Sequence, residues 1–315
     1  MRSFVAFSSV AALILLSLWP AHAQQQPYRG ATNVVAVYAT VKDRDGRLVP
    51  NLEQQDFEVR DNGTVRPIEL FSSDVQPLSV AILLDRSGSM MGHAEVVEHG
   101  AEKFVEHLLP ADHARIGDFS RYIRFHPNEF TNDKDLLIDV LRNNLQSNLN
   151  GPSPVWSALV RAINVVSAQQ GRRVVLVFTD GMDEPAYDQD RTKFQAVKDH
   201  AIENEVMIYA IAVPAQVVGA GAIVMGRQYG GGTKYEPPNK QLRELADATG
   251  GGHLPFDWAQ NLDTIFTRVA DELHRQYLIG FSPVRLDGKV HQISVNSKKS
   301  GLTVRARQSY VAEGQ

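Results

Sequence analysis

The sequence predicts an α/β fold with a doubly wound, mainly parallel sheet, flanked by a β-rich module built from both chain ends. Three observations lead to this prediction. Apolar runs alternate with amphipathic helical stretches over residues 77–276. Short alternating strands with hairpin turns lie on either side of that region. Acidic and hydroxyl residues follow two of the apolar runs directly, which is typical of the ligand-binding edge of such a sheet.

Residues 1–23 have the pattern of a secretory signal peptide. Arg2 precedes an apolar stretch over residues 10–19, and "AHA" at residues 21–23 is a small-x-small cleavage site. The apolar stretch is too short to span a bilayer, and no second one follows. We therefore expect a secreted or periplasmic protein with no membrane span after cleavage.

The composition excludes several classes of protein. Hydrophobic residues make up 43% of the chain and charged residues 22%, as in globular proteins, and the formal net charge of −4 offers no basic surface for nucleic acid. The chain of 315 residues has no cysteine. The absence of cysteine excludes a lipid-anchored lipoprotein, disulfides, thiolate metal sites and cysteine nucleophiles.

The segment 24–76 is predicted to form short strands. "VVAVYATV", "DFEVR" and "PIELF" are strand-like, and an Asp-Gly and an Asn-Gly pair mark turns between them. We expect Val35, Val37 and Tyr38 to share one apolar face. The segment is too small to be stable alone.

The region 77–276 alternates buried strands with amphipathic helices, which predicts one domain with helices on both faces of a mainly parallel sheet. The strands read "LSVAILL", "ARIGDFS", "YIRF", "RRVVLVF" and "VMIYAIAVP". The helices read "AEVVEHGAEKFVEHLL", "NDKDLLIDVLRNNL", "SPVWSALVRAINVVSAQQG", "RTKFQAVKDHAIENE", "KQLRELADATGGG" and "NLDTIFTRVADELHRQ".

The segment 277–315 returns to β structure, with "YLIGFSP", "VHQISVN" and "GLTVRARQSYV" as strands. Ile293, Val295 and Val304 form its apolar face. Since the ends of a compact domain commonly lie close together, we expect this segment to pair with the N-terminal one in a single sheet or sandwich.

Two acids and three hydroxyls are predicted to converge at the carboxyl edge of the central sheet. Asp85, Ser87 and Ser89 follow the strand "LSVAILL", Asp180 follows "VVLVFT", and Ser153 precedes a helix. Two neighbouring carboxylates repel each other unless a cation lies between them. A donor set made only of oxygens favours Mg²⁺, or otherwise Mn²⁺ or Ca²⁺.

This arrangement resembles the metal-ion-dependent adhesion site of von Willebrand factor type A domains. Asp85-x-Ser87-x-Ser89 is similar to the first loop of that site, "GPSPVWSAL" to the second and "FTDG" to the third. The likeness covers about residues 78–276 and implies the family's Rossmann-like sheet. The two flanks resemble exported acidobacterial-type von Willebrand A-related proteins. Ser153 stands where the family usually has threonine, and a proline on each side stiffens this loop.

The resemblance implies a function as well as a fold. In the family, hydroxyls bind the metal directly, one or both aspartates act through water, and one coordination position accepts a partner's carboxylate. We therefore expect a metal-dependent adhesion or binding protein that captures an acidic group of a protein or glycan, with no catalytic residues. Two alternatives stay open: a metal-dependent hydrolase with Asp180 or Asp183 as base, and a structural envelope protein whose metal site stabilises the fold.

Two further acids, three histidines and a glycine-rich stretch lie outside the predicted metal site. Asp183 and Glu184 are either solvated turn residues or groups that tune the site. The histidines at 93, 99 and 107 lack zinc-helix spacing and are interpreted as surface or packing residues. The glycine-rich stretch 216–238 is expected to be an exposed, mobile loop outside the metal site.

Overall fold

The computed structural model describes residues 34–145, 151–185, 191–213, 223–224, 227–228, 238–256 and 262–313. The chain divides by its contacts into Met1–Thr32 and Asn33–Gln315, and all described residues belong to the second unit. The predicted signal peptide therefore lies outside the described residues. So does most of the stretch 216–238, apart from a short hairpin of β10 (Ile223–Val224) and β11 (Arg227–Gln228).

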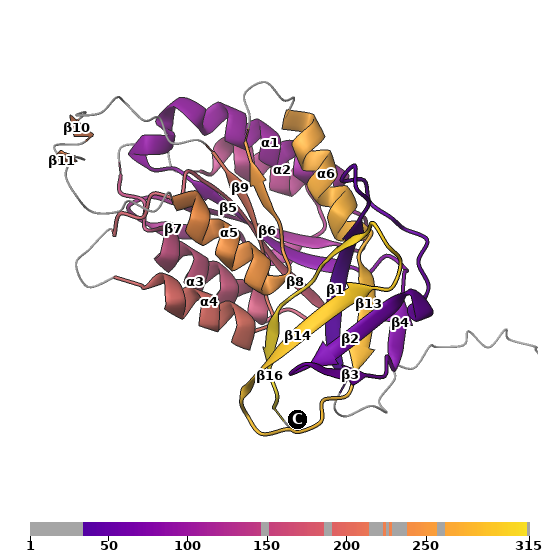
Figure 1. Ribbon diagram of the computed structural model, residues 1–315. Helices are drawn as coiled ribbons and strands as arrows, with labels where there is room; N and C mark the ends of the chain where they lie inside the picture. Colours follow the sequence, from indigo (N-terminus) through magenta and orange to yellow (C-terminus); the bar gives the residue numbers. More distant parts are fainter. Residues whose placement is uncertain are drawn as a thin grey trace, which may run out of the picture. The chain divides into compact units, whose positions relative to one another are not determined.

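A six-stranded sheet forms the centre of the fold (Figure 1). Its order is β12 (His253–Pro255), β9 (Met207–Ala212), β8 (Arg172–Thr179), β5 (Leu78–Asp85), β6 (His113–Phe119) and β7 (Ile123–Thr131). All neighbours pair in parallel except β6 and β7, which are antiparallel. Every residue of β5 and β9 is buried, as expected for strands with both faces covered.

Helices cover both faces of this sheet (Figure 1). On one face lie α1 (Ala94–His107), α2 (Lys134–Asn143) and α6 (Leu262–His274), and on the other α3 (Val155–Ser167), α4 (Phe194–Glu203) and α5 (Pro238–Thr249). Each layer has its own apolar core against the sheet. The predicted doubly wound α/β fold is thus confirmed. Within the described parts of the chain, no helix is both long enough and apolar enough to cross a membrane.

The path of the chain creates a switch point beside β5. From β5 the chain moves outward through β6 and β7, and then returns to β8 and moves outward the other way through β9 and β12. The loops after β5 and β8 therefore diverge at adjacent strand ends, and open α/β sheets bind ligands at such a point.

The two chain ends build the β-rich module together, as the predicted fold class requires. One of its sheets runs β15 (Thr303–Arg305), β1 (Val35–Lys42), β13 (Tyr277–Phe281) and β4 (Leu70–Ser72). The other runs β16 (Ser309–Val311), β14 (Val290–Ser297), β2 (Phe57–Asp61) and β3 (Thr64–Arg66). Strands from both ends share one apolar core, which includes Val59, Ile279 and Val295. The module is therefore a small sandwich that neither segment could complete alone.

One expectation for β1 is wrong. Val37 faces the module core, but Tyr38 does not share that face: its ring packs against the core of the central domain and lies under Arg172, with the guanidinium carbon 4.9 Å from the ring centroid. Successive side chains of a strand point to opposite faces, so Val37 and Tyr38 cannot lie together. Strand β1 is consequently buried on both sides, by the module and by the central domain.

Deleting residues 277–315 should unfold the N-terminal segment, because it removes β13 to β16, the strands that pair with and pack on β1 to β4. We expect limited proteolysis to cleave the truncated chain within residues 34–72, at a protease level that leaves the full chain intact. A chain shortened only by residues 314–315 is the control. Continued protection of residues 34–72 in the deletion variant would show that the two flanks are independent.

Candidate metal centre

The candidate site lies at the carboxyl ends of β5 and β8. These strands pair in parallel, with Leu84 opposite Phe178, so Asp85 and the residues after β8 reach the same edge. Asp85 is 1% exposed and Asp180 is 2% exposed. The register of two central strands therefore brings two buried acids to the switch point.

The first loop turns sharply so that alternate side chains face one spot. The backbone N–H of Ser87 donates to Asp85 Oδ1 at 2.9 Å, and a short 3-10 helix, η2 (Gly88–His93), follows. The Ser87 and Ser89 hydroxyls lie 3.2 Å apart. Ser87 is buried, whereas Ser89 is exposed at the rim.

The second loop is fastened to the first by backbone and side-chain hydrogen bonds. Gly88 N–H donates to the Gly151 carbonyl at 3.0 Å, and Gly151 bridges to Ser87. Two residues later, Ser153 Oγ donates to Asp85 Oδ2 at 3.0 Å and is itself 3% exposed. The loop thus delivers the Ser153 hydroxyl directly to the Asp85 carboxylate.

The third loop supplies the second acid. Asp180 Oδ1 accepts a hydrogen bond from the Met182 backbone N–H at 2.9 Å. Among the described residues, Asp180 Oδ2 is a buried oxygen with no hydrogen-bond partner. Such an oxygen carries a desolvation cost that a bound cation would offset.

The electrostatics of the two acids also favour a cation. Burial, and after it the neighbouring Asp180, raises the pKa of Asp85 from 3.8 to about 6. Burial likewise raises the pKa of Asp180. Two buried carboxylates that lie close together resist being ionised at the same time unless positive charge lies between them. No cluster of three or more His, Cys, Asp or Glu side chains suited to a metal occurs in the described part of the chain, so the donors here are two acids plus hydroxyls. That set suits a hard divalent cation.

A protein-family model matches the region that contains this site. The model of the von Willebrand factor type A (VWA) domain matches residues 79–262. This chain belongs to that family. The match spans the central sheet from the second residue of β5 onward and all three loops of the site, and it confirms the resemblance seen in the sequence.

Three solved structures are similar to this chain at low sequence identity. A von Willebrand factor type A protein from Catenulispora acidiphila is 12% identical, with 90% of this chain and 75% of that one covered and a TM-score of 0.48. An aerotolerance-related membrane protein from Bacteroides fragilis is 18% identical, with coverage of 62% and 98% and a TM-score of 0.47. Proximal thread matrix protein 1 from the mussel byssus, with a zinc-occupied MIDAS motif, is 13% identical, with coverage of 69% and 50% and a TM-score of 0.50. No curated protein matches the chain.

The structure brings together all five side chains predicted for the candidate metal site, which is called the VWA site below: Asp85, Ser87, Ser89, Ser153 and Asp180. Their role as metal ligands remains a prediction. Of the two acids left open by the sequence, Asp183 accepts a hydrogen bond from the Trp156 backbone N–H at 3.2 Å, at the start of α3. The Glu184 backbone N–H donates to the Ser153 carbonyl at 2.7 Å. Both residues therefore brace the second loop, and neither carboxylate joins the five side chains.

One residue of the candidate metal site, Thr179, was missed by sequence reasoning. Thr179 Oγ1 donates to Asp85 Oδ2 at 2.6 Å and also accepts from the Gly181 N–H at 2.9 Å. His93, interpreted from the sequence as a surface or packing residue, is buried, with 5% of it exposed. The register between β5 and β8 places Thr179 beside Asp85, and the sequence alone does not contain that register.

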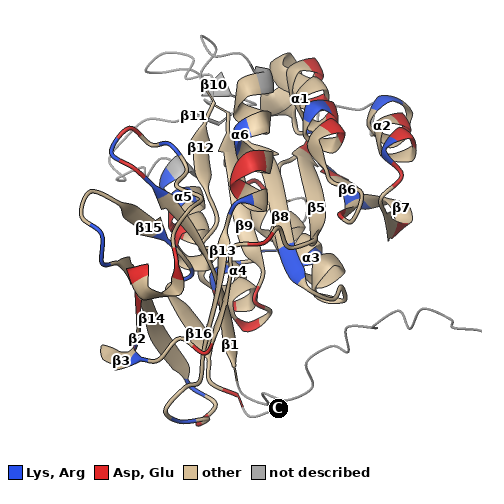
Figure 2. Ribbon diagram, turned by 90° about the vertical axis from the view of Figure 1, so that its right-hand side faces the viewer, with Lys and Arg blue, Asp and Glu red and all other residues tan. Residues whose placement is uncertain are grey.

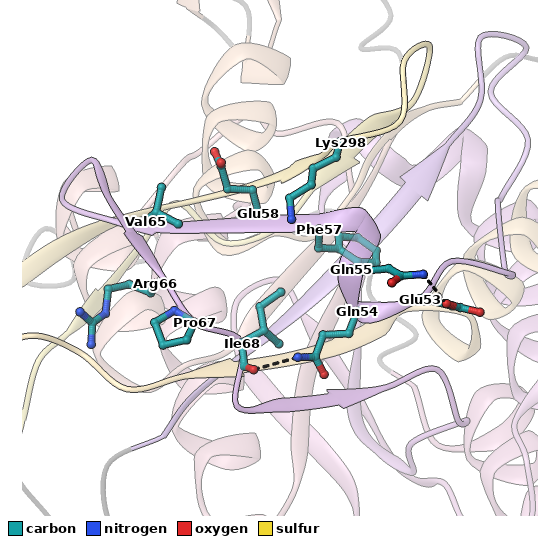
Figure 3. Close-up of a pocket in the computed structure, with 10 residues that line it drawn as sticks. All are labelled: Glu53, Gln54, Gln55, Phe57, Glu58, Val65, Arg66, Pro67, Ile68 and Lys298. Atoms are coloured by element: carbon teal, nitrogen blue, oxygen red, sulfur yellow. Dashed lines mark hydrogen bonds between the residues drawn. The ribbon is translucent and has the colours of Figure 1, made fainter.

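An open pocket in the module is separate from the VWA site (Figure 3). Its volume is about 470 Å³, and it lies between η1 (Gln54–Asp56), β2 and the residues that follow β3. Gln54 Nε2 donates across it to the Ile68 carbonyl at 3.0 Å. None of the five site residues lines this pocket.

The metal-free protein should become less stable as pH rises through the range 4 to 6. The pKa of Asp85 is raised in the folded state, so between pH 4 and 6 the folded protein keeps a proton on Asp85 that the unfolded chain has released. The free energy of unfolding therefore falls as pH rises, until Asp85 is ionised in both states. A shift of this size corresponds to about 3 kcal/mol. In chelator, Asp85→Asn should therefore raise the Tm at pH 7 and have little effect near pH 4. Equal Tm changes at both pH values would contradict this assignment.

Proposed function

We propose that the protein binds a divalent cation, Mg²⁺ in the first instance, through Asp85, Ser87, Ser89, Ser153 and Asp180. The observation that carries the proposal is the buried, unpartnered Oδ2 of Asp180 beside a second buried acid. Mn²⁺ and Ca²⁺ share the preference for oxygen donors and are the other candidates.

The cation would serve to capture an acidic group of a protein or glycan partner. Three of the five donors are neutral hydroxyls, so a bound cation keeps much of its positive charge and attracts an outside carboxylate. Ser89 lies at the exposed rim, which leaves the cation reachable from solvent. The mussel byssus protein with its zinc-occupied motif supports the proposal as a precedent within this fold.

We further propose that the protein acts by binding outside the cytoplasm and not by catalysis. The signal-peptide pattern of residues 1–23 supports export. Both acids accept hydrogen bonds, Asp85 from Ser153 and Thr179 and Asp180 from Met182, and we assign the remaining oxygen of Asp180 to the cation rather than to a base. A metal-dependent hydrolase is the alternative, and ester hydrolysis assays with and without Mg²⁺ would reveal it.

Calorimetric titration with Mg²⁺ tests the metal site directly. We expect Asp180→Asn and Ser153→Ala to weaken Mg²⁺ binding by at least tenfold, because each removes a donor oxygen or its charge. Ser153→Thr should retain binding, since it restores the family's usual hydroxyl. Asp183→Asn is the matched control: it changes an acid three residues from Asp180 that braces α3, and it should leave Mg²⁺ binding unchanged.

Capture of a partner is a second test. Immobilised mature protein should retain partners from its own envelope in Mg²⁺ and release them in chelator, and Asp180→Asn should retain none. Normal retention by that variant, or retention unaffected by chelator, would overturn the proposed binding function. If chelator lowered the Tm without affecting retention, the metal site would be structural.

A further inference from the structure

A second cavity lies at the opposite end of the central sheet from the metal site. Its volume is about 260 Å³, and it is lined by residues of β1, β8, α4, α5 and the chain just after β15. It therefore lies where the central domain meets the β module. Arg172 begins β8 and Asp180 follows its last residue, so the two sites are about 25 Å apart.

Three guanidinium groups line this cavity, with one carboxylate. Arg307 Nη1 lies 2.8 Å from Glu205 Oε1, and Arg173 Nη2 lies 3.3 Å from Glu205 Oε2. Arg172 is the third. Glu205 thus offsets only one of three positive charges, and Arg307, whose side chain is 11% exposed, is largely withdrawn from water.

Arg172 is the charge with the weakest compensation. It is 3% exposed, it donates to the Leu273 carbonyl and to Gln276 Oε1, and it covers the ring of Tyr38. These partners are all neutral. Within the described ranges, no carboxylate lies within ion-pair distance of Arg172. Burial lowers the pKa of its guanidinium, the direction expected of a charge short of counter-ions.

The neighbouring network does not supply the missing negative charge. Glu272 is 5% exposed and is already shared by Arg305 and by Lys42, whose Nζ is 2.6 Å from Oε2. Burial, and after it Arg305, lowers the pKa of Lys42 to about 8. The chain after β15, which carries Arg307, runs beside the end of α5 (Figure 2), where Gln308 N–H donates to the Ala248 carbonyl at 3.1 Å. The whole junction is rich in cations.

The remaining walls of the cavity are mostly apolar. Ala201, Ile202 and Val206 come from α4 and the chain after it, Met207 from β9 and Ala248 from α5. An inorganic anion would meet the guanidinium groups but leave these walls without contacts. An organic acid with a short hydrocarbon chain would satisfy both, because burying each CH₂ group against these walls adds to its affinity.

We propose that this cavity binds a small organic acid, a monocarboxylate with a short apolar chain, whose carboxylate meets the Arg172, Arg173 and Arg307 cluster. The site is independent of the proposed metal function. A ligand held between the domain and the module binds the folded state alone, and it therefore stabilises their junction by mass action.

Thermal unfolding in the presence of sodium hexanoate tests the proposal. Chelator is present throughout, so that the metal site cannot contribute. We expect hexanoate to raise the Tm by about 2 to 4 °C at saturation. Hexanamide, which has the same shape without charge, and sodium chloride at equal ionic strength should not. Equal shifts with hexanoate and sodium chloride would overturn the proposal.

Variants locate the effect in the cavity. Arg173→Gln removes one cation of the cluster, and Ile202→Phe fills space without changing charge. Each should weaken hexanoate binding at least tenfold. Arg142→Gln, which removes an arginine paired with Glu102 on α1, is the matched control and should bind as the native chain does. Native binding by both Arg173→Gln and Ile202→Phe would place the acid elsewhere and refute the site. Asp85→Ala should bind hexanoate normally, because loss of metal binding leaves this cavity intact.

Discussion

The carboxylate of Asp85 is the point to which the three loops of the candidate metal centre are attached. It accepts hydrogen bonds from Ser87 N–H, Ser153 Oγ and Thr179 Oγ1, so the strand β5, the second loop and the end of β8 meet on a single buried group. This group is costly to bury as an ion, and its raised pKa expresses that cost. The loops of the site are therefore held in place by the same carboxylate whose ionised form is costly to bury. A cation would relieve that conflict without moving the loops.

Buried charge without full compensation also occurs at the opposite end of the domain. There the conflict is an excess of buried positive charge, centred on Arg172, and its neutral partners come from both structural parts: Tyr38 from the module, and Gln276 and the Leu273 carbonyl from the end of α6. Gln276 Nε2 also donates to Thr40 Oγ1 at 2.7 Å, which extends the contact into β1. The VWA domain thus carries a negative site at the carboxyl ends of its strands and a positive one at their amino ends.

Much of this arrangement was predictable from sequence, because it depends on local patterns. Continuous apolar strands separated by amphipathic helices define the doubly wound sheet, and acids placed directly after such strands fall at its ligand edge. What the sequence could not supply depends on register and on orientation between parts. Thr179 meets Asp85 only because β5 and β8 pair as they do. Tyr38 leaves the module core because β1 is covered on its second face by the central domain. The continuous apolar run "VVAVYATV" agrees with burial on both faces, but it does not say which part of the protein covers the second face.

The closing of the module by both chain ends has a mechanical consequence. The VWA domain is inserted between β4 and β13, while β1 pairs with β13, and β14 pairs with β2. A pulling force applied between Val35 and Val311 would be resisted first by the hydrogen-bonded ladders and apolar core of the sandwich. Only after those strands separated would tension reach the inserted domain and the loops of the candidate site. The module thus closes the base of the domain, so that force between the two chain ends is borne by the sandwich first.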